Sequence, residues 1–515
     1  MELVEQALDA LDLRPDGPGL AVGVYSGGQA LHTSTRGAAT VEFGVPIDAH
    51  TRFDIASISK QFTATCLLLL AADGKVRLSD DVRTHLPELR LEVPVTLGQC
   101  LRHTGGLPEW YALHAVTGVP LRGLDEDRLL RLLAGIRRTL FEPGSAFSYS
   151  NTGYILAAAV IRRAGGLSLA AFARERLLGP LGMDDSVFRD DASLPLPRLA
   201  FGYTGEGRRA DTEESAVGDG GLVTSVADLA PWFGFLADGR VLGSEVREAL
   251  LERTVLADGT VLPYAQGICH LDAQGLRGYG HAGGMPGYVS NLVHLPDSGL
   301  GVAVLTNHSG LDPVGLSLSL ARTLGAPSVP SPASRPVASP APARRADLVG
   351  HWRDPQTEAT LSIEAAPDDA ISVTGPGELT LTAGDDGRWH ETGVAAGAWL
   401  TLEDGRLLLG DDRSIRWPTA FVPCDPPGSG TPPEGVWLND EFGVLAVLRK
   451  GELRVGLTYA APVAPAPAGA WRAGAFSFRV ADSGDLLLDG PGLRGLRFAV
   501  QPEDTVAVGI PPGLT

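Results

Sequence analysis

The stretch that most constrains the fold is "APSVPSPASRPVASPAPAR", at residues 326–344. Proline has no N–H for a helix or a sheet ladder, and a composition rich in proline, alanine and serine is typical of a semi-rigid linker. A second proline-rich stretch, "CDPPGSGTPPEG", begins at Cys424. The 515 residues also exceed what one hydrophobic core holds. We therefore predict three domains, at 1–326, 346–424 and 435–515, joined by linkers at 327–345 and 425–434.

The first of these segments has the pattern of an α+β domain. Apolar alternation over residues 20–55 predicts a hairpin followed by a strand, and "YVSNLVHL" and "LGVAVLTN" on either side of "PDSG" predict an antiparallel hairpin. Strands at both ends with helices between them predict one antiparallel sheet flanked by helices. The helices are expected at 57–73, 125–138, 152–164 and 168–178, with a last one ending near residue 325.

The two C-terminal segments consist of short strands separated by turns such as "EDGR" and "GDDR". They open alike, with "GHWRDPQTEATLSI" at residue 350 and "GVWLNDEFGVLAVL" at residue 435. This weak internal similarity predicts two related small antiparallel β-barrels.

Composition excludes several classes of function. A formal net charge of −19 argues against a nucleic-acid partner, and apolar runs such as "LLLLAA" are too short to span a bilayer. The N-terminus has neither the basic nor the apolar region of a signal peptide. The four cysteines lie far apart, without the spacing of a metal site or a disulfide framework. We expect a cytoplasmic protein with no metal, no other cofactor and no membrane partner; a homodimer stays open.

Lysine is rare in this chain, with three lysines among 42 basic residues, and one of them lies in "ASISKQF" at 56–62. Ser57 and Lys60 would share one face of a helix that starts here. Burial and the helix dipole both disfavour a charged lysine at such a position, and a lysine that gives up its proton can act as a base toward the hydroxyl. Arginine cannot do this. Alone the motif is weak, because it arises by chance in roughly one chain in six and because a capping serine with a solvated lysine is a common structural alternative. The apolar flank "QFTATCLLLL" argues against a solvated lysine.

Two further elements carry polar groups suited to catalysis. Tyr149 and Asn151 lie in a loop before a predicted helix, where a phenol can pass a proton and an amide can bind a carbonyl. His281 and Gly283 lie in "GYGHAGG", which leads into the predicted hairpin and is expected on an edge strand. Each element alone is more often structural: such a tyrosine usually packs, and so does a lone histidine beside glycines.

Taken in order, S-x-x-K, Y-x-N and H-x-G resemble the signature of the penicillin-recognising serine hydrolases, which include class C β-lactamases, DD-peptidases, family VIII esterases and D-aminopeptidases. "LRHTGGLPEW" at 101–110 resembles a further segment of that family, and the resemblance spans most of residues 20–325. It implies the β-lactamase and DD-peptidase fold for the first domain and the following roles. Ser57 would be the acylated nucleophile, and Lys60 and Tyr149 would be the pair that transfers protons. Asn151 would bind the substrate amide or Lys60, while His281 and Gly283 would belong to the strand that faces the substrate. The N–H groups of Ser57 and Gly284 would form the oxyanion hole.

The third motif narrows the substrate. β-Lactamases and DD-peptidases usually carry lysine there, as K-T-G, to meet a carboxylate, whereas histidine with its pKa of about 6.5 is largely neutral at pH 7. The H-x-G form and the three-domain plan resemble the D-aminopeptidases, which implies a small-molecule or peptide amide with a free amine at a D-residue. An ester, then a DD-peptide or β-lactam, are the alternatives, and a non-catalytic binding protein on the same scaffold is the alternative of another class. The chain has no G-x-S-x-G, H-E-x-x-H or C-x-x-C motif, which argues against an α/β-hydrolase or a metal mechanism.

Overall fold

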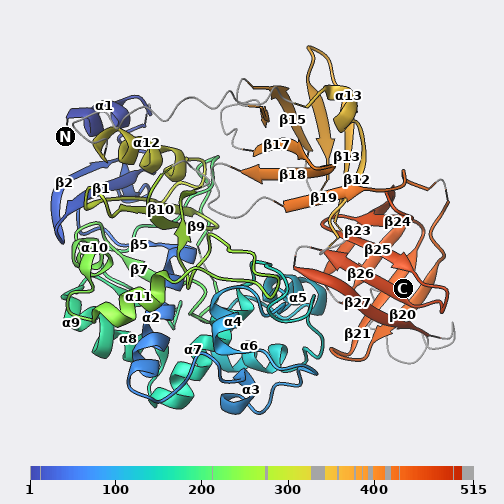
Figure 1. Cartoon of the computed structure of the whole chain (residues 1–515), viewed down its shortest axis with the longest axis horizontal. Helices are drawn as coiled ribbons and strands as arrows, with labels where there is room; N and C mark the ends of the chain where they lie inside the picture. Colours follow the sequence, from blue (N-terminus) through green and yellow to red (C-terminus); the bar gives the residue numbers. More distant parts are fainter. Residues whose placement is uncertain are drawn as a thin grey trace.

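A six-stranded antiparallel sheet organises the first 325 residues of the computed structural model (Figure 1). Its middle strands are buried on both faces because helices cover both sides. The strands lie in the order β2 (Gln29–Arg36), β1 (Leu20–Ser26), β11 (Leu300–Thr306), β10 (Tyr288–Leu295), β9 (Tyr279–Met285) and β8 (Cys269–His270). The sheet therefore joins the two ends of the domain, as the sequence predicts.

The structure describes residues 2–501 apart from residues 12, 212, 273–275, 326–342, 356–358, 376–377, 385–386, 392–397, 412–418, 429, 457 and 491. The predicted linker at 327–345 lies outside the described residues as far as residue 342. Among the helices that the structure describes, no single one is long and apolar enough to cross a membrane.

Alternate residues of β1 face opposite layers of helices, as the pleat of a strand requires. Val22 and Val24 pack toward α1 (Glu2–Asp9) and α12 (Pro313–Gly325). On the opposite face, Tyr25 stacks on Phe233 of α10 (Leu229–Asp238), with ring centroids 4.5 Å apart. The core of the domain thus continues through both faces of the sheet.

The helical layer is built around α2 (Ser59–Ala72), which packs against α7 (Thr152–Gly165) and is buried along almost its whole length. This confirms the expectation from its apolar sequence. It ends before Gly74, whose φ of +70° is the left-handed conformation that glycine adopts at little cost. The other helices are α3 (Val82–His85), α4 (Leu97–Leu101), α5 (Trp110–Thr117), α6 (Glu126–Leu133) and α11 (Ser244–Leu251).

The helix predicted at 168–178 is not continuous. It begins as α8 (Leu169–Ala173), passes through a π-helical turn at Arg174–Leu178 and ends as α9 (Gly179–Leu181). The N–H of Gly179 donates to the carbonyl of Arg174, five residues earlier, so the turn is one residue wider than an α-helical one. Hydrophobic periodicity alone does not reveal such a widening.

Two small sheets complete the first domain. β5 (Phe53–Asp54) pairs with β7 (Leu222–Thr224), which also pairs with β6 (Val187–Phe188). β3 (Ala38–Thr40) pairs with β4 (Val45–Pro46). β5 leads directly into the turn that carries Ser57.

The C-terminal region forms two closed eight-stranded antiparallel barrels, as predicted (Figure 1). Trp352 and Trp437 hold equivalent positions on the first strand of each barrel, and both are buried with the indole N–H donated to a carbonyl. The first barrel, which follows the short helix α13 (Arg345–Leu348), comprises β12 (Gly350–Arg353), β13 (Thr360–Ala365), β14 (Ile371–Thr374), β15 (Glu378–Ala383), β16 (Trp389–Glu391), β17 (Ala398–Glu403), β18 (Arg406–Asp411) and β19 (Thr419–Pro423). The second comprises β20 (Gly435–Asn439), β21 (Val444–Arg449), β22 (Glu452–Val455), β23 (Tyr459–Ala466), β24 (Ala470–Ala473), β25 (Phe476–Val480), β26 (Leu486–Gly490) and β27 (Leu493–Val500).

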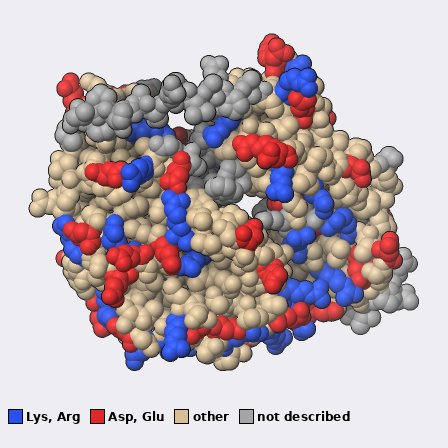
Figure 2. Space-filling view, viewed as in Figure 1, with Lys and Arg blue, Asp and Glu red and all other residues tan. Residues whose placement is uncertain are grey.

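The second barrel contacts both of its neighbours. Arg472 donates to the carbonyls of Gly375 and Thr360 in the first barrel, at 2.9 and 3.1 Å. The turn between β26 and β27 reaches the first domain, where the carbonyl of Gly492 accepts the N–H of Glu109 at 2.8 Å. Basic and acidic side chains are interspersed over the face of the molecule in Figure 2.

Candidate active site

Ser57 lies in the first turn of the helix that continues as α2, within the 3₁₀ turn η1 (Ala56–Ile58). The preceding Ala56 has a φ of +47°, a left-handed conformation that is uncommon for a residue with a side chain. The Asp54 carboxylate accepts the N–H of Ala56 at 2.8 Å and so supports this conformation. The first N–H groups of a helix have no acceptor within it, so the turn presents the Ser57 N–H as a donor.

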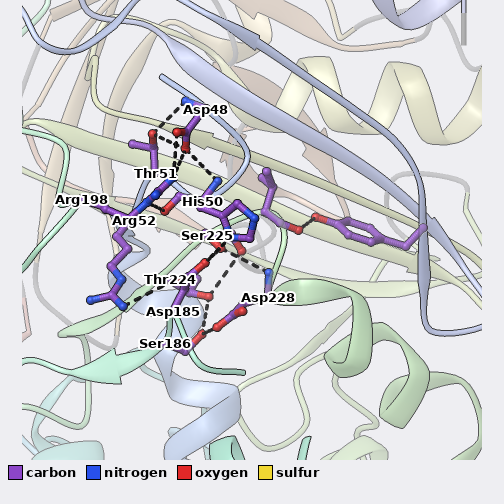
Figure 3. A network of polar contacts seen from close by, with 12 residues as sticks. Asp48, His50, Thr51, Arg52, Asp185, Ser186, Arg198, Thr224, Ser225 and Asp228 are labelled. Carbon is purple, nitrogen blue, oxygen red and sulfur yellow. Dashed lines mark hydrogen bonds and ion pairs between the residues drawn. The ribbon is translucent and has the colours of Figure 1, made fainter. Parts of the chain in front are cut away.

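A polar network holds the strands that deliver Ser57 (Figure 3). Asp185 accepts from His50 Nδ1 at 2.7 Å and from Ser225 Oγ at 3.1 Å, and its other oxygen lies 3.6 Å from Arg52 just before β5. On the other side of the network, the hydroxyls of Ser186 and Thr224 lie 2.7 Å apart, and that of Ser186 also donates to Asp228 at 2.8 Å. Asp185 thereby links His50 and Arg52, which precede β5, to Ser225, which follows β7.

Lys60 is completely buried one turn after Ser57. Its Nζ lies 3.0 Å from Ser57 Oγ, 2.7 Å from Asn151 Oδ1 and 2.6 Å from the carbonyl oxygen of Asp219. The two last partners only accept, whereas a hydroxyl can also donate. An uncharged Lys60 would direct its two hydrogens to Asn151 and Asp219 and its lone pair to the hydroxyl of Ser57, which is the arrangement of a base.

Asn151 is held in turn by Glu109. The carboxylate of Glu109 accepts the main-chain N–H of Asn151 at 2.7 Å and its side-chain N–H at 3.2 Å. This pair of contacts turns Oδ1 of Asn151 toward Lys60. Because the N–H of Glu109 donates to Gly492, a hydrogen-bonded path runs from the second barrel to Lys60.

Tyr149 lies over Lys60 and beside His103. The centroid of its ring is 5.0 Å from Lys60 Nζ and 4.2 Å from the imidazole of His103. Ser148 and Ser150, on either side of Tyr149, donate their N–H groups to the carbonyl and to Nδ1 of His103, at 3.0 and 3.1 Å. His103 therefore fixes the backbone on both sides of Tyr149.

Gly283 is required by a close approach of two backbones. A Cβ added there would lie 2.1 Å from the carbonyl oxygen of Ile55 and 2.6 Å from Ser290 Oγ, whereas one added at Gly284 would meet nothing within 4 Å. β9 therefore packs directly against the residues that precede Ser57. This explains why glycine follows His281 at a spacing of two.

The pairing of β9 indicates where Gly284 points. Leu271 donates its N–H to the carbonyl of Gly278 at 2.9 Å, and Cys269 of β8 pairs with Gly280. Hydrogen-bonding groups alternate in direction along an antiparallel strand, so Gly284 directs its N–H to the same side as Gly280. The prediction that His281 and Gly283 lie on an edge strand is confirmed in part. β9 extends past the end of β8 at these two residues, but β8 is the outermost strand of the sheet among the described residues.

A cavity of about 430 Å³ opens at this edge of the sheet. Five residues predicted from the sequence line it, while Lys60 and Asn151 lie behind Ser57. Asp312 is the only Asp, Glu, Lys or Arg side chain among the lining residues that the structure describes. The lining residues are Ser57, Tyr149, Tyr264, His281, Ala282, Gly283, Gly284, Val289, Ser290, Ser309, Leu311, Asp312, Pro313 and Val314.

Two buried carboxyl groups lie next to this site. Burial raises the pKa of Asp54 to about 7 and that of Asp219 to about 6. In Asp219 the nearby Lys60 and the indole N–H of Trp110, 2.8 Å from Oδ2, oppose this increase of the pKa. Within the described residues, no group of three or more His, Cys, Asp or Glu side chains is arranged to hold a metal ion.

Four residues of this site have no counterpart in the sequence prediction: Glu109, Asp219, Tyr264 and Asp312. Glu109 lies in the segment "LRHTGGLPEW", so its neighbourhood was indicated although its role was not. Asp312 precedes "PVGLSLSL" and caps α12, with Oδ1 accepting the N–H of Gly315 at 2.9 Å. The sequence around Asp219 and Tyr264 carries no comparable signal.

Comparisons with known proteins bear on the whole chain. The sequence profile of the family described as Beta-lactamase matches residues 3–326. A D-aminopeptidase of Cereibacter sphaeroides is 29% identical over 418 residues, which cover 79% of this chain and 77% of that protein. A D-aminopeptidase of Brucella anthropi is 30% identical over 357 residues, which cover 68% of this chain and 66% of that protein. The crystal structure of SurE with D-Leu has the same fold over 97% of this chain and 98% of its own, with a TM-score of 0.54 and 22% identity. The similarity of fold therefore includes both barrels.

Proposed function

The chain belongs to the beta-lactamase family, and we propose that it hydrolyses amide or peptide bonds of the D-aminopeptidase type through an acyl-enzyme on Ser57. The observation that carries the proposal is the contact of Ser57 Oγ with the buried Lys60 Nζ at the edge of the cavity. Both relatives named above are D-aminopeptidases, and their similarity to this chain extends beyond the first domain.

In the proposed reaction, Lys60 takes the proton of the Ser57 hydroxyl while Oγ attacks the carbonyl carbon of the substrate. The N–H groups of Ser57 and Gly284 stabilise the negative charge that develops on the carbonyl oxygen. The C–N bond then breaks, and Tyr149 and Lys60 return the proton to the leaving amine. Water hydrolyses the ester on Ser57 by the same steps in reverse order.

We propose that the substrate carries a free amine, with Asp312 on the cavity wall as the acceptor for its positive charge. A carboxylate offers about four lone-pair sites, so capping α12 through Oδ1 leaves capacity to bind an ammonium group. The described lining of the cavity has no Lys or Arg side chain, which also favours a positively charged ligand.

A panel of chromogenic substrates tests this proposal. We expect D-alanine p-nitroanilide to be turned over faster than its N-acetyl derivative, a p-nitrophenyl ester and a chromogenic cephalosporin. Asp312→Asn should raise KM about tenfold for the free amine, the value of one charge-assisted hydrogen bond, and should leave KM for the N-acetyl derivative unchanged. Turnover of the ester alone would contradict the proposal, and so would an equal effect of Asp312→Asn on both amides.

We propose that the protein acts in the cytoplasm. All four cysteines lie within the described residues and none forms a disulfide, as is usual in a reducing compartment. Burial raises the pKa of the thiols of Cys66 and Cys100, which keeps both groups protonated and unreactive.

A further inference from the structure

A chain of hydrogen bonds runs along the wall of the cavity and joins two histidines through one tyrosine. Nε2 of His103 lies 3.1 Å from Oη of Tyr264, and this Oη lies 3.0 Å from Nε2 of His281. All three residues are buried, with exposed fractions of 3%, 3% and 4%. The chain starts at the N–H of Ser150, 3.1 Å from His103 Nδ1, and ends at the carbonyl of Ala282, 2.6 Å from His281 Nδ1.

The two main-chain ends determine where each proton lies. An amide N–H only donates, so His103 Nδ1 is the acceptor and its Nε2 carries the hydrogen that Tyr264 Oη accepts. A carbonyl only accepts, so His281 Nδ1 carries a hydrogen, and Nε2 of the neutral ring is then an acceptor. The hydroxyl of Tyr264 therefore donates to His281 Nε2. Each of the four contacts then has one donor and one acceptor, and both imidazoles are uncharged.

A proton added to His281 would disturb this arrangement. Its new N–H would point at Tyr264 Oη, which already accepts from His103, and the phenolic hydrogen would have to leave His281 Nε2. It would turn to the hydroxyl of Tyr154, which also contacts Tyr264 and donates its own hydrogen to the carbonyl of Leu101 at 2.7 Å. Burial raises the pKa of Tyr264 well above its ordinary value, so the phenol stays protonated and keeps its hydrogen to donate. The network thus favours the neutral form of His281.

We propose that Tyr264 is a positioning residue that holds His281 of the third motif as the uncharged Nδ1–H tautomer, with its ring fixed in the cavity wall. Tyr264 and His281 both line the cavity, and their rings are nearly perpendicular, with centroids 5.7 Å apart. Because Ser150 lies between Tyr149 and Asn151, the same chain of hydrogen bonds ties the second motif to the third.

This inference rests on the proposed amide hydrolysis and deepens it by specifying the leaving group. The titratable groups that face His281 are Tyr264, Tyr149 and Asp312, and all three line the same cavity. The ring centroids of Tyr149 and His281 are 6.2 Å apart, and Lys60 lies on the other side of the Tyr149 ring. None of them supplies a cation to the cavity wall. The site should therefore accept uncharged leaving groups and disfavour one that carries a carboxylate.

The matched variants are Tyr264→Phe and Tyr279→Phe. Tyr279 lies on β9 two residues before His281, is also buried, and donates its hydroxyl to the carbonyl of Leu236 at 2.7 Å. Both variants remove one buried tyrosine hydroxyl, but only Tyr264→Phe removes the partner of His281 Nε2. The chain has 11 histidines, so the ring signals of His281 in [15N]histidine-labelled full-length protein are identified through His281→Gln.

Ring 15N NMR at pH 7.5 tests the inference without reference to any substrate. We expect a protonated Nδ1 and an unprotonated, hydrogen-bonded Nε2 in the unsubstituted protein and in Tyr279→Phe, and a changed Nε2 signal in Tyr264→Phe. A protonated Nε2 in the unsubstituted protein would overturn the inference even if no variant folded. An unchanged Nε2 signal in folded Tyr264→Phe would also overturn it.

Kinetics at pH 6 provide the second measurement. We expect kcat/KM for D-alanine amide to exceed that for D-alanylglycine, and we expect Tyr264→Phe to reduce this ratio about tenfold because the released imidazole takes up a proton. An unchanged ratio in Tyr264→Phe would overturn the inference. If neither compound is hydrolysed, the proposed function fails while the NMR result still decides the role of Tyr264.

Discussion

The close packing of β9 against the turn that carries Ser57 makes Gly283 the most informative position for a small substitution. A Cβ at Gly283 would lie 2.1 Å from the carbonyl oxygen of Ile55, nearly an ångström inside the shortest contact that real side chains make. In a close-packed interior the surroundings cannot absorb this locally, so Gly283→Ala must move β9 away from Ser57 by about 1 Å. The neighbouring Gly284→Ala adds the same methyl group to open space.

The displacement has two measurable consequences. Overpacking of this kind costs about 1–3 kcal/mol in the free energy of unfolding. Displacing one oxyanion donor from the nucleophile by about 1 Å lowers kcat/KM about a hundredfold. For Gly284→Ala, which keeps the N–H and meets no neighbouring atom, we expect a smaller loss of activity and a change in the free energy of unfolding below about 0.5 kcal/mol.

The assay compares kcat/KM for D-alanine p-nitroanilide with urea unfolding of the full chain for both variants. The two glycines are adjacent on one strand and differ mainly in what lies beyond their Cα hydrogens, so each serves as a control for the other. Equal activity of Gly283→Ala and Gly284→Ala would refute the argument that this backbone contact sets the geometry of the site.

Two further predictions concern the dependence of stability on pH. The pKa of Asp54 is raised to about 7, so between pH 4 and pH 7 the folded state binds more protons than the unfolded state and the free energy of unfolding falls as the pH rises. Asp54→Asn keeps an oxygen for the N–H of Ala56 and should make the difference in the free energy of unfolding between pH 4 and pH 8, measured by urea unfolding, about 4 kcal/mol smaller. An unchanged difference would contradict the raised pKa. His294 has no hydrogen-bond partner at either ring nitrogen within the described residues, and burial lowers its pKa to about 4. The unfolded state then binds more protons below pH 6.5, so the free energy of unfolding falls by about 3 kcal/mol as the pH drops to 4, and His294→Phe should abolish this decrease in the same experiment; equal acid sensitivity of the variant would refute it.

The sequence predicted those parts of the structure that depend on local patterns. The hairpin of β10 and β11 follows from two apolar runs around "PDSG", and the burial of α2 follows from its lack of a polar face. The three motifs predicted the residues that the structure brings together around one cavity, because each motif places its groups on a single turn or strand. Their catalytic roles remain proposals.

The rest of the site could not be predicted because it is made by tertiary contacts. Tyr264 acquires its position from His103, 161 residues earlier, and no local pattern in "LPYAQG" reveals that contact. Glu109 is held by Gly492 of a different domain, and its own role appears only through Asn151. Single residues whose function depends on distant partners are therefore missed even where the motifs are found.

Covalent labelling of Ser57 tests whether this residue is the nucleophile. The full chain is treated with a fluorophosphonate, and its intact mass and the peptide that contains Ser57 are measured beside a Ser57→Ala variant whose folding is confirmed by circular dichroism. We expect one adduct on Ser57, parallel loss of amide hydrolysis, and neither label nor turnover in Ser57→Ala. An unlabelled Ser57 in folded protein, with turnover that survives Ser57→Ala, would contradict it.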